Sequence, residues 1–257
     1  MSRLASFLQN VDTLATVMPG KLEAATYILH SKLNHDAVAN GAYKGQPFIF
    51  RRDDIPAVRE VLEKQEYSVL TPHITASESP LILDIGAHIG TTSLWILGVN
   101  PKARILSVEA NTENYNWLQK NHHAAQSRYQ DWKIIYGAAW KDRDGVSFIS
   151  DGPTMSRRVG GQSAEKVPTH TFPDLINLIA PQNEMIDLAK IDIEGAEEAF
   201  ICAHPECLKR LKTVVIELHP NLCDTDRVLD ALKAVFNTIK PVHDRKSSKP
   251  LLICTNE

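Results

Sequence analysis

The stretch LILDIGAHIGTTSLWIL, residues 81–97, determines the expected fold. It begins with an apolar run of strand length, passes through two glycines four positions apart, and continues into an apolar segment of helical length. A buried strand, a glycine turn and a helix in this order are typical of the first βαβ unit of an open parallel sheet. Ligands of such sheets bind beyond the carboxyl ends of the strands, so we expect a binding site at residues 84–90.

Further apolar runs of strand length follow along the chain. They are RILSVE (104–109), KIIY (133–136), IDLAKIDI (186–193) and TVVIEL (213–218), separated by segments with helical patterns. This alternation predicts a mainly parallel sheet covered by helices on both faces. The last two runs, VFNTIK (235–240) and PLLICT (250–255), are close enough to pair antiparallel, so the last strand should be reversed. Between residues 137 and 186 we expect a hairpin inserted at the sheet edge.

Residues 1–75 are predicted to form a helical N-terminal extension, and residues 76–257 the α/β domain. Apolar residues at helical spacing predict two helices before residue 45, broken at MPG (18–20), and PFIF (47–50) predicts a short strand. The segment IPAVREVLEKQEYSVL (55–70) predicts a helix that packs on the domain or covers its pocket. The N-terminal helices are also the expected contact if the protein forms a homo-oligomer.

Composition excludes several classes of protein. The 257 residues carry a net charge of −3, and the pI is near 6.4, so we expect no basic face for nucleic acid or anionic lipid. No apolar run approaches the roughly 20 residues that cross a bilayer, and the N-terminal residues lack the apolar core of a signal peptide. Four scattered cysteines do not suggest a disulfide framework. We expect a cytoplasmic protein with neither nucleic acid nor membrane as a partner.

Acidic residues at the ends of the first two predicted strands indicate the ligand. From Asp84 to Gly90 the pattern is D-x-G-x-x-x-G, whereas a pyrophosphate loop has G-x-G-x-x-G and no adjacent carboxylate. S-adenosylmethionine carries a sulfonium and an ammonium group and no phosphate, so Asp84 would attract it. Glu109, 25 residues later, can accept both hydroxyl hydrogens of an adenosine ribose. Taken separately, Asp84 could cap the turn and Glu109 could be solvated; their joint placement favours donor binding.

Small residues complete the expected donor site. Gly86 permits a sharp turn and Gly90 a close approach of the following helix. The third predicted strand ends in YGAAW, where two alanines leave room for adenine against the backbone. The expected cofactor-binding residues are Asp84, Gly86, Ala87, His88, Gly90, Glu109, Ala110, Ala138, Ala139 and Asp192.

With DIGAHIG, SVEAN, GAAW, VPTHTFPDLI, KIDIEGAE and VIELH in this order, the chain resembles the FkbM-type family of S-adenosylmethionine-dependent methyltransferases. The resemblance runs from about residue 81 to 219, and KIDIEGAE followed by ELH is its most specific part. It implies an α/β fold with a Rossmann-like seven-stranded methyltransferase sheet, donor binding at residues 84–90 and Glu109, and O-methylation of a hydroxyl on a sugar, polyketide or other small molecule. HTFPDLI departs from the family's TLDDL-like run, and residues 1–80 lie outside the shared core, so the acceptor pocket is not defined by the resemblance.

Acids and a histidine follow the fourth and fifth predicted strands. Asp192 and Glu194 end the fourth, while Glu217 and His219 lie two apart on one face of the fifth. Because an alcohol must lose a proton to accept a methyl group, we expect His219 or Asp192 as the base, and Glu194 and Glu217 as residues that orient the acceptor. His219 is the better match by its intrinsic pKa, although a histidine at a strand end is often structural.

Other interpretations of these residues stay open. Asp192, Glu217 and His219 could bind a divalent ion, but three ligands on two strand ends are a modest signal, so no metal is included in the expected site. Glu197 and Glu198, in the first turn of the next helix, are expected only to complement the helix dipole. The alternative functions are a nicotinamide-dependent oxidoreductase, against which Asp84 and the missing G-x-G-x-x-G argue, and a noncatalytic cofactor-binding scaffold.

Overall fold

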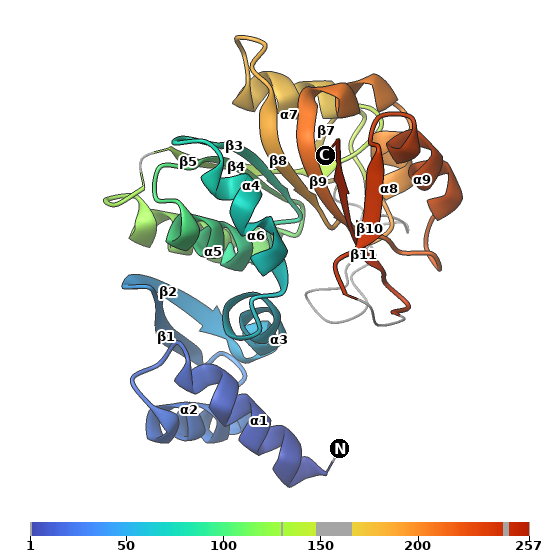
Figure 1. Ribbon diagram of the computed structural model, residues 1–257. Coiled ribbons are helices and arrows are strands. Elements are labelled where there is room, and N and C mark those ends of the chain that lie inside the picture. The colour runs from blue at the N-terminus through green and yellow to red at the C-terminus, as the bar shows by residue number, and fades with distance from the viewer. Residues whose placement is uncertain (1, 130, 148–165, 244–246, 257) are drawn as a thin grey trace.

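A seven-stranded sheet forms the centre of the protein in a computed structural model, which describes residues 2–129, 131–147, 166–243 and 247–256 (Figure 1). Its strands are β3 (Leu81–Ile85), β4 (Arg104–Glu109), β5 (Trp132–Tyr136), β8 (Ile186–Ile191), β9 (Leu211–Glu217), β10 (Thr238–Pro241) and β11 (Leu251–Thr255). Their order across the sheet is β10-β11-β9-β8-β3-β4-β5. All seven predicted runs of residues therefore form strands of one sheet.

The direction of the strands also agrees with the prediction. Strands β9, β8, β3, β4 and β5 pair in parallel, whereas β11 is antiparallel to both β9 and β10. The chain builds the sheet outward from β3 to β5 and then crosses back to β8, so the strand order reverses between β3 and β8. Ligands of open α/β sheets bind at such a point, and the carboxyl ends of β3 and β8 meet there.

Helices cover both faces of the sheet (Figure 1). One face is covered by α5 (Thr91–Val99) and α6 (Thr112–Ala125), the other by α7 (Phe172–Ile179), α8 (Glu197–Ile201) and α9 (Thr225–Lys233). Successive residues of a strand point to opposite faces: Ile82 belongs to the core with Trp95, and Leu83 to the core with Phe172. The central strands are thus buried on both sides, which explains their nearly continuous apolar sequence.

The N-terminal part contains two helices, as predicted, and a hairpin. Helices α1 (Arg3–Ala15) and α2 (Lys21–Leu33) precede β1 (Val38–Tyr43) and β2 (Gln46–Arg51), which pair antiparallel. Lys44 and Gly45 have positive φ angles of 48° and 78°, as the two central residues of a tight hairpin turn require. The predicted strand 47–50 lies in β2, but β1 was not predicted because its sequence VANGAY is rich in residues of low strand propensity.

Asn121 of α6 attaches this hairpin to the α/β domain. Its buried amide accepts a hydrogen bond from the Ile49 backbone N–H at 2.7 Å and donates to the carbonyls of Ile49 (3.0 Å) and Ile89 (2.9 Å). Residues of α1, α2 and the hairpin also belong to the same core cluster as α5 and α6. The predicted division at residue 75 stays a prediction, and the two parts share one apolar core.

The segment before β3 forms several short helical turns. They are η1 (Arg52–Asp54), α3 (Ile55–Ala57), the π-helical η2 (Val58–Glu63), η3 (Glu66–Leu70) and α4 (Thr71–Thr75). The single helix predicted for residues 55–70 is interrupted at Gln65, whose φ of 50° is left-handed. Val58, Val61 and Leu62 are buried, in agreement with the predicted packing of this segment on the domain.

The segment after β5 is only partly described. Strand β6 (Ala138–Ala139) pairs in parallel with β7 (Thr169–His170), and Val146 forms an antiparallel bridge with Val167. Residues 148–165 of the predicted hairpin lie outside the described residues. A 3₁₀ helix, η5 (Pro205–Arg210), leads into β9.

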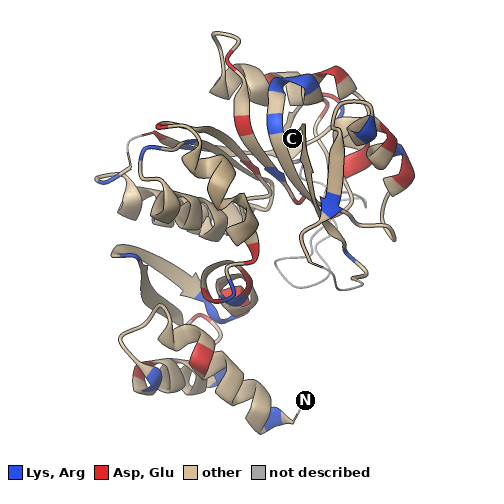
Figure 2. Cartoon of the chain, in the orientation of Figure 1, with Lys and Arg blue, Asp and Glu red and all other residues tan. Residues whose placement is uncertain are grey.

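Three features of the described residues bear on possible partners. Lys and Arg are interspersed with Asp and Glu over the elements drawn in Figure 2. None of the helices in the described ranges is both long and apolar enough to cross a lipid bilayer. Several leucines on α1 and α2 are exposed, at Leu4, Leu8, Leu22, Leu29 and Leu33, and self-association through these helices stays a prediction.

Candidate active site

A cavity of about 1120 Å³ lies at the carboxyl ends of β3, β4, β8 and β9. Residues within the segments 57–67, 241–243 and 247–251 contribute further walls, so the N-terminal part both packs on the domain and borders the pocket. Single small-molecule pockets have volumes of roughly 300–1,000 Å³. The cavity is therefore slightly larger than the usual pocket for a single small ligand.

The glycine loop after β3 forms one wall. Gly86, Ala87 and His88 line the cavity, as predicted for donor-binding residues. Gly86 has a φ of 82°, and a Cβ atom placed on it would lie 1.8 Å from the backbone oxygen of Asp192. Only a glycine fits this approach of two strand ends.

Gly90 has a packing role. It does not line the cavity, and a Cβ on it would lie 2.9 Å from Leu118 and 3.1 Å from Trp132. Its φ of 92° and missing side chain allow α5 to begin close to α6 and β5. This agrees with the predicted close approach of the helix, and the donor contact predicted for Gly90 stays a prediction.

Glu109 ends β4 and lines the cavity next to the glycine loop. Its Oε2 accepts a hydrogen bond from the His88 backbone N–H at 2.8 Å, and its Oε1 accepts one from the Asn111 N–H at 2.7 Å. Burial raises the pKa of Glu109, and these two hydrogen bonds oppose the increase because they favour the charged carboxylate. Because a carboxylate oxygen can accept two hydrogen bonds, each oxygen retains one for a ligand.

Asp84 differs from the prediction, because its side chain does not line the cavity. The carboxylate is fully buried, accepts a hydrogen bond from Ser93 Oγ at 2.6 Å and lies 3.7 Å from Lys190 Nζ. Strand alternation turns it toward α5 behind the glycine loop. The predicted direct contact of Asp84 with a cationic ligand is therefore not supported by the structure.

Lys190 is a site residue that the sequence analysis missed. It is buried in β8 and lines the cavity, and its ammonium donates a hydrogen bond to the Gly86 carbonyl at 2.6 Å. Burial opposes its charge, but the carboxylates of Asp192 and Asp84 raise the pKa of Lys190. A lysine within the apolar run IDLAKIDI was the available signal, since unpaired lysines are almost never fully buried.

The remaining predicted donor residues lie together at the end of β4 and β5. Ala110, Ala138 and Ala139 line the cavity, as expected for a surface against which adenine packs. Asn111 and Asn114, which sequence reasoning did not identify, line the same wall. Asn111 caps α6 by accepting a hydrogen bond from the Asn114 N–H at 3.0 Å, so its side chain is held in place.

His88 connects the glycine loop to the N-terminal part. Its Nε2 lies 3.3 Å from Asp54 Oδ1, and the same carboxylate oxygen accepts a hydrogen bond from Arg51 at 2.8 Å. Burial alone would raise the pKa of Asp54, but the adjacent His88 ring and the Arg51 guanidinium lower it to about 2.

This shift predicts a pH-dependent stability. A carboxyl group whose pKa falls from an ordinary 3.8 to about 2 contributes roughly 2 kcal/mol above pH 4, and this contribution is lost as the pH falls toward 2. Urea unfolding of the Asp54→Asn variant should therefore show a deficit at pH 6 that shrinks by about half at pH 3. A deficit of equal size at both pH values would contradict the lowered pKa.

The opposite end of the cavity carries the predicted acceptor-side acids. Asp192, Glu194 and Glu217 all line it. Burial would raise the pKa of Asp192, but the nearby Lys190, 3.5 Å away, and His219 lower it. Burial and the adjacent Asp192 carboxylate raise the pKa of Glu217 to about 8. Asp192 is thus the acid of this pair that is ionised near neutral pH.

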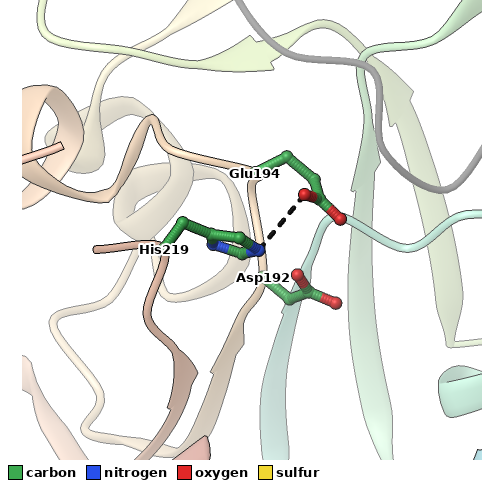
Figure 3. A group of neighbouring side chains, drawn as sticks. All are labelled: Asp192, Glu194 and His219. Atoms are coloured by element: carbon green, nitrogen blue, oxygen red, sulfur yellow. Dashed lines mark ion pairs between the residues drawn. The ribbon is translucent and has the colours of Figure 1, made fainter. Parts of the chain in front are cut away.

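His219 does not fit the predicted role of a base. It is 2% exposed and does not line the cavity. Its Nδ1 lies 2.8 Å from Glu197, and its Nε2 lies 3.2 Å from Glu194, as Figure 3 shows for the second pair. Burial alone would lower its pKa, but these two carboxylates raise the pKa of His219 to about 10. A protonated imidazole cannot accept a proton, so Asp192 is the remaining candidate.

Glu197 also differs from its prediction. Its side chain is fully buried and accepts hydrogen bonds from the Gly195 N–H at 3.1 Å and the Cys223 thiol at 3.3 Å, in addition to its contact with His219. It holds the turn after β8 against the end of β9. Its neighbour Glu198 pairs at the surface with Arg227.

Known structures resemble the chain only distantly. The methyltransferase FkbM of Methylobacillus flagellatus KT is 15% identical over 80% of this chain and 55% of that chain, with a TM-score of 0.49. The precorrin-6y C5,15-methyltransferase of Geobacter metallireducens GS-15 is 14% identical over 74% and 87%, with a TM-score of 0.43. The fibrillarin of Aeropyrum pernix, in complex with S-adenosyl-L-methionine, is 13% identical over 75% and 74%, with a TM-score of 0.44. This chain thus spans about half the length of the first of these proteins.

Sequence comparison gives the family. No curated protein matches the chain. Residues 84–237, more than half of the chain, match the methyltransferase FkbM domain, and this range contains β3 to β9 with the glycine loop and the acids at the strand ends. The chain therefore belongs to the FkbM methyltransferase family, as its sequence motifs imply.

Proposed function

We propose that the protein transfers the methyl group of S-adenosylmethionine to a hydroxyl group of a small molecule or glycan. The observation that carries the proposal is the position of Glu109. Two backbone N–H groups fix its carboxylate at the cavity wall, and one acceptor position of each oxygen stays available for a ribose hydroxyl. The small residues of β6 then provide the adjacent surface for adenine.

The charge of the cavity supports a cationic donor. Among the described residues, six acids and three lysines line the cavity; the acids are Glu60, Glu66, Glu109, Asp192, Glu194 and Glu217, and the lysines are Lys64, Lys190 and Lys249. An excess of carboxylates attracts a sulfonium and an ammonium group and repels a pyrophosphate. This balance favours S-adenosylmethionine over the nicotinamide dinucleotide of the alternative function.

The acceptor-side acids support O-methylation. Methyl transfer is an in-line displacement, so the acceptor must lie beyond the donor's methyl group, and holding both reactants in one cavity supplies much of the rate enhancement. A hydroxyl acceptor also loses its proton. Asp192 lines the cavity at the end of β8, next to the glycine loop, and is the carboxylate that we assign to accept this proton.

Binding of S-adenosylhomocysteine to the Glu109→Gln variant tests the donor site. An amide has one oxygen, so its NH₂ group would face one of the two backbone N–H donors and would leave that donor unpaired. The variant would also lose the charge that favours the ribose hydroxyls. We expect calorimetry to show an affinity about 100-fold weaker than that of the wild type.

The matched control is Glu206→Gln, because Glu206 is exposed in η5 and does not line the cavity. Its affinity for S-adenosylhomocysteine should equal that of the wild type. Equal affinity of the Glu109→Gln variant would contradict the assigned ribose contact. Thermal stabilisation of the wild type by NAD but not by S-adenosylhomocysteine would favour the oxidoreductase alternative.

A further inference from the structure

We propose that Asp192, Glu194 and His219 bind a divalent metal ion at the acceptor end of the cavity. Figure 3 shows the three side chains, from the end of β8, the following turn and the end of β9, directed toward one another. One ligand atom from each residue lies within 4.8 Å of the other two. Around an octahedral ion with bonds of about 2.1 Å, ligands stand about 3 to 4.2 Å apart. Small side-chain movements would therefore bring the three atoms to the distances that ligands of one ion require.

Two buried polar atoms without partners point to a missing ligand. Six buried side-chain atoms of the described residues have no hydrogen-bond partner, and two of them, His219 Nε2 and Asp192 Oδ1, lie in this cluster. The Nε2 atom lies 3.2 Å from Glu194, but this ion pair lacks the geometry of a hydrogen bond. Buried polar atoms in native proteins nearly always have partners, and an ion between these residues would serve both atoms.

Glu197 orients His219 for this role. Its Oε1 lies 2.8 Å from His219 Nδ1, and its own position is fixed by the Gly195 N–H and by Cys223. Histidines that bind metals usually donate their other ring N–H to a carboxylate, which directs the free nitrogen lone pair at the ion. When the ion is bound, His219 Nδ1 would carry the proton and donate a hydrogen bond to Glu197. His219 Nε2 would be the ligand of the ion.

The ligands indicate the kind of ion. Imidazole is a good ligand for Zn²⁺ and a poor one for Mg²⁺, whereas carboxylates bind Mg²⁺ and Mn²⁺ readily. One imidazole with two carboxylates should therefore bind Zn²⁺ and Mn²⁺ more tightly than Mg²⁺. This ligand set differs from the one considered from sequence, because Glu194 lies 3.2 Å from His219 Nε2 and Glu217 lies 3.8 Å from it.

The role of the ion rests on the proposed function. An ion bound here would hold the acceptor oxygen and make its proton more acidic. The hydroxyl proton would pass to Asp192 Oδ2, the bond between the acceptor oxygen and the methyl carbon would form, and the bond from that carbon to sulfur would break, which releases S-adenosylhomocysteine. Binding of the ion itself can be measured without any acceptor.

The test is a Mn²⁺ titration of the full chain after treatment with EDTA and dialysis. Paramagnetic resonance of free Mn²⁺ should show one bound equivalent, and Zn²⁺ should displace it at lower concentrations than Mg²⁺ does. Asp192→Asn and Glu194→Gln should each weaken binding at least 10-fold, and Glu197→Gln should weaken it about 10- to 100-fold. Glu198→Gln is the matched control, because Glu198 is adjacent in α8 but pairs with Arg227 instead.

A variant that should bind the ion more tightly distinguishes loss of a ligand from misfolding, because a misfolded protein would not gain affinity. Lys249 Nζ donates hydrogen bonds to both oxygens of Glu194, at 2.9 and 3.1 Å, and thus competes with an ion. Lys249→Met should therefore bind Mn²⁺ more tightly than the wild type. No stoichiometric binding by the wild type, or equal affinities in the wild type, Asp192→Asn and Glu194→Gln, would overturn the proposal. S-adenosylhomocysteine binding in the same samples separates this failure from a failure of the proposed function.

Discussion

Replacing Gly86 with alanine is expected to destabilise the protein by about 3 kcal/mol and to abolish donor binding. An alanine at a φ of 82° is strained by roughly 1–2 kcal/mol. Its Cβ would also lie 1.8 Å from the Asp192 carbonyl oxygen, which is a backbone atom that cannot rotate away. The turn after β8 would have to move, and such overpacking costs about 1–3 kcal/mol more.

Urea unfolding and calorimetry with S-adenosylhomocysteine measure the two effects of Gly86→Ala. Gly20→Ala is the control, because Gly20 has extended backbone and its nearest neighbour would be the flexible end of Glu23, at 3.3 Å. This control should lose less than about 1 kcal/mol and retain donor affinity. A Gly86→Ala protein with wild-type stability would show that the ends of β3 and β8 do not approach as closely as described.

The central strands of the sheet were predictable because each of them is an apolar run. Strands buried on both faces leave a continuous signal, and the short separation of β10 and β11 predicted the reversed last strand. The sequence pattern was a weaker guide to the N-terminal part. Strand β1 pairs through alanine and glycine, and the helix predicted for residues 55–70 breaks at Gln65, a residue that does not by itself indicate a left-handed turn.

The donor site was predictable at the level of strand ends and less so for individual side chains. Asp84 and Glu109 each follow an apolar run, and sequence alone does not show that Asp84 turns behind the loop toward Ser93 while Glu109 lines the cavity. The orientation depends on where α5 packs. The position of a residue along a strand thus predicts at which end of the sheet the residue lies. It predicts less well which groups the side chain contacts.

The acceptor site could not be derived from intrinsic pKa values. Free histidine titrates near neutrality, which made His219 the preferred base. In the folded chain two carboxylates, Glu194 and Glu197, surround the ring, and Glu197 comes from the helix that follows β8. A contact between residues 22 positions apart on different elements leaves no local sequence pattern.

Replacing Asp192 with asparagine is expected to lower methyl transfer about 10²- to 10⁴-fold, which is the usual contribution of a positioned general base. The amide has nearly the same shape and cannot accept the acceptor's proton. Transfer of a labelled methyl group into hydroxylated metabolites and glycans identifies an acceptor first, and the turnover of the variant on that acceptor is then compared with the wild type. Asp230→Asn, on the exposed surface of α9, should retain full activity.

Donor affinity decides what a loss of activity in Asp192→Asn means. Asp192 meets the glycine loop through its backbone oxygen, which the substitution retains, so S-adenosylhomocysteine should bind within about threefold of the wild type. Lost turnover with retained donor binding would place Asp192 at the acceptor end of the cavity, as the base or as a ligand of the ion that holds the acceptor oxygen. Lost donor binding would assign it to the donor site instead, and turnover within tenfold of the wild type would exclude it as the base. If the wild type binds the donor but methylates no acceptor in the panel, the noncatalytic scaffold becomes the better explanation, because the donor contacts that we assign to Glu109 do not depend on an acceptor.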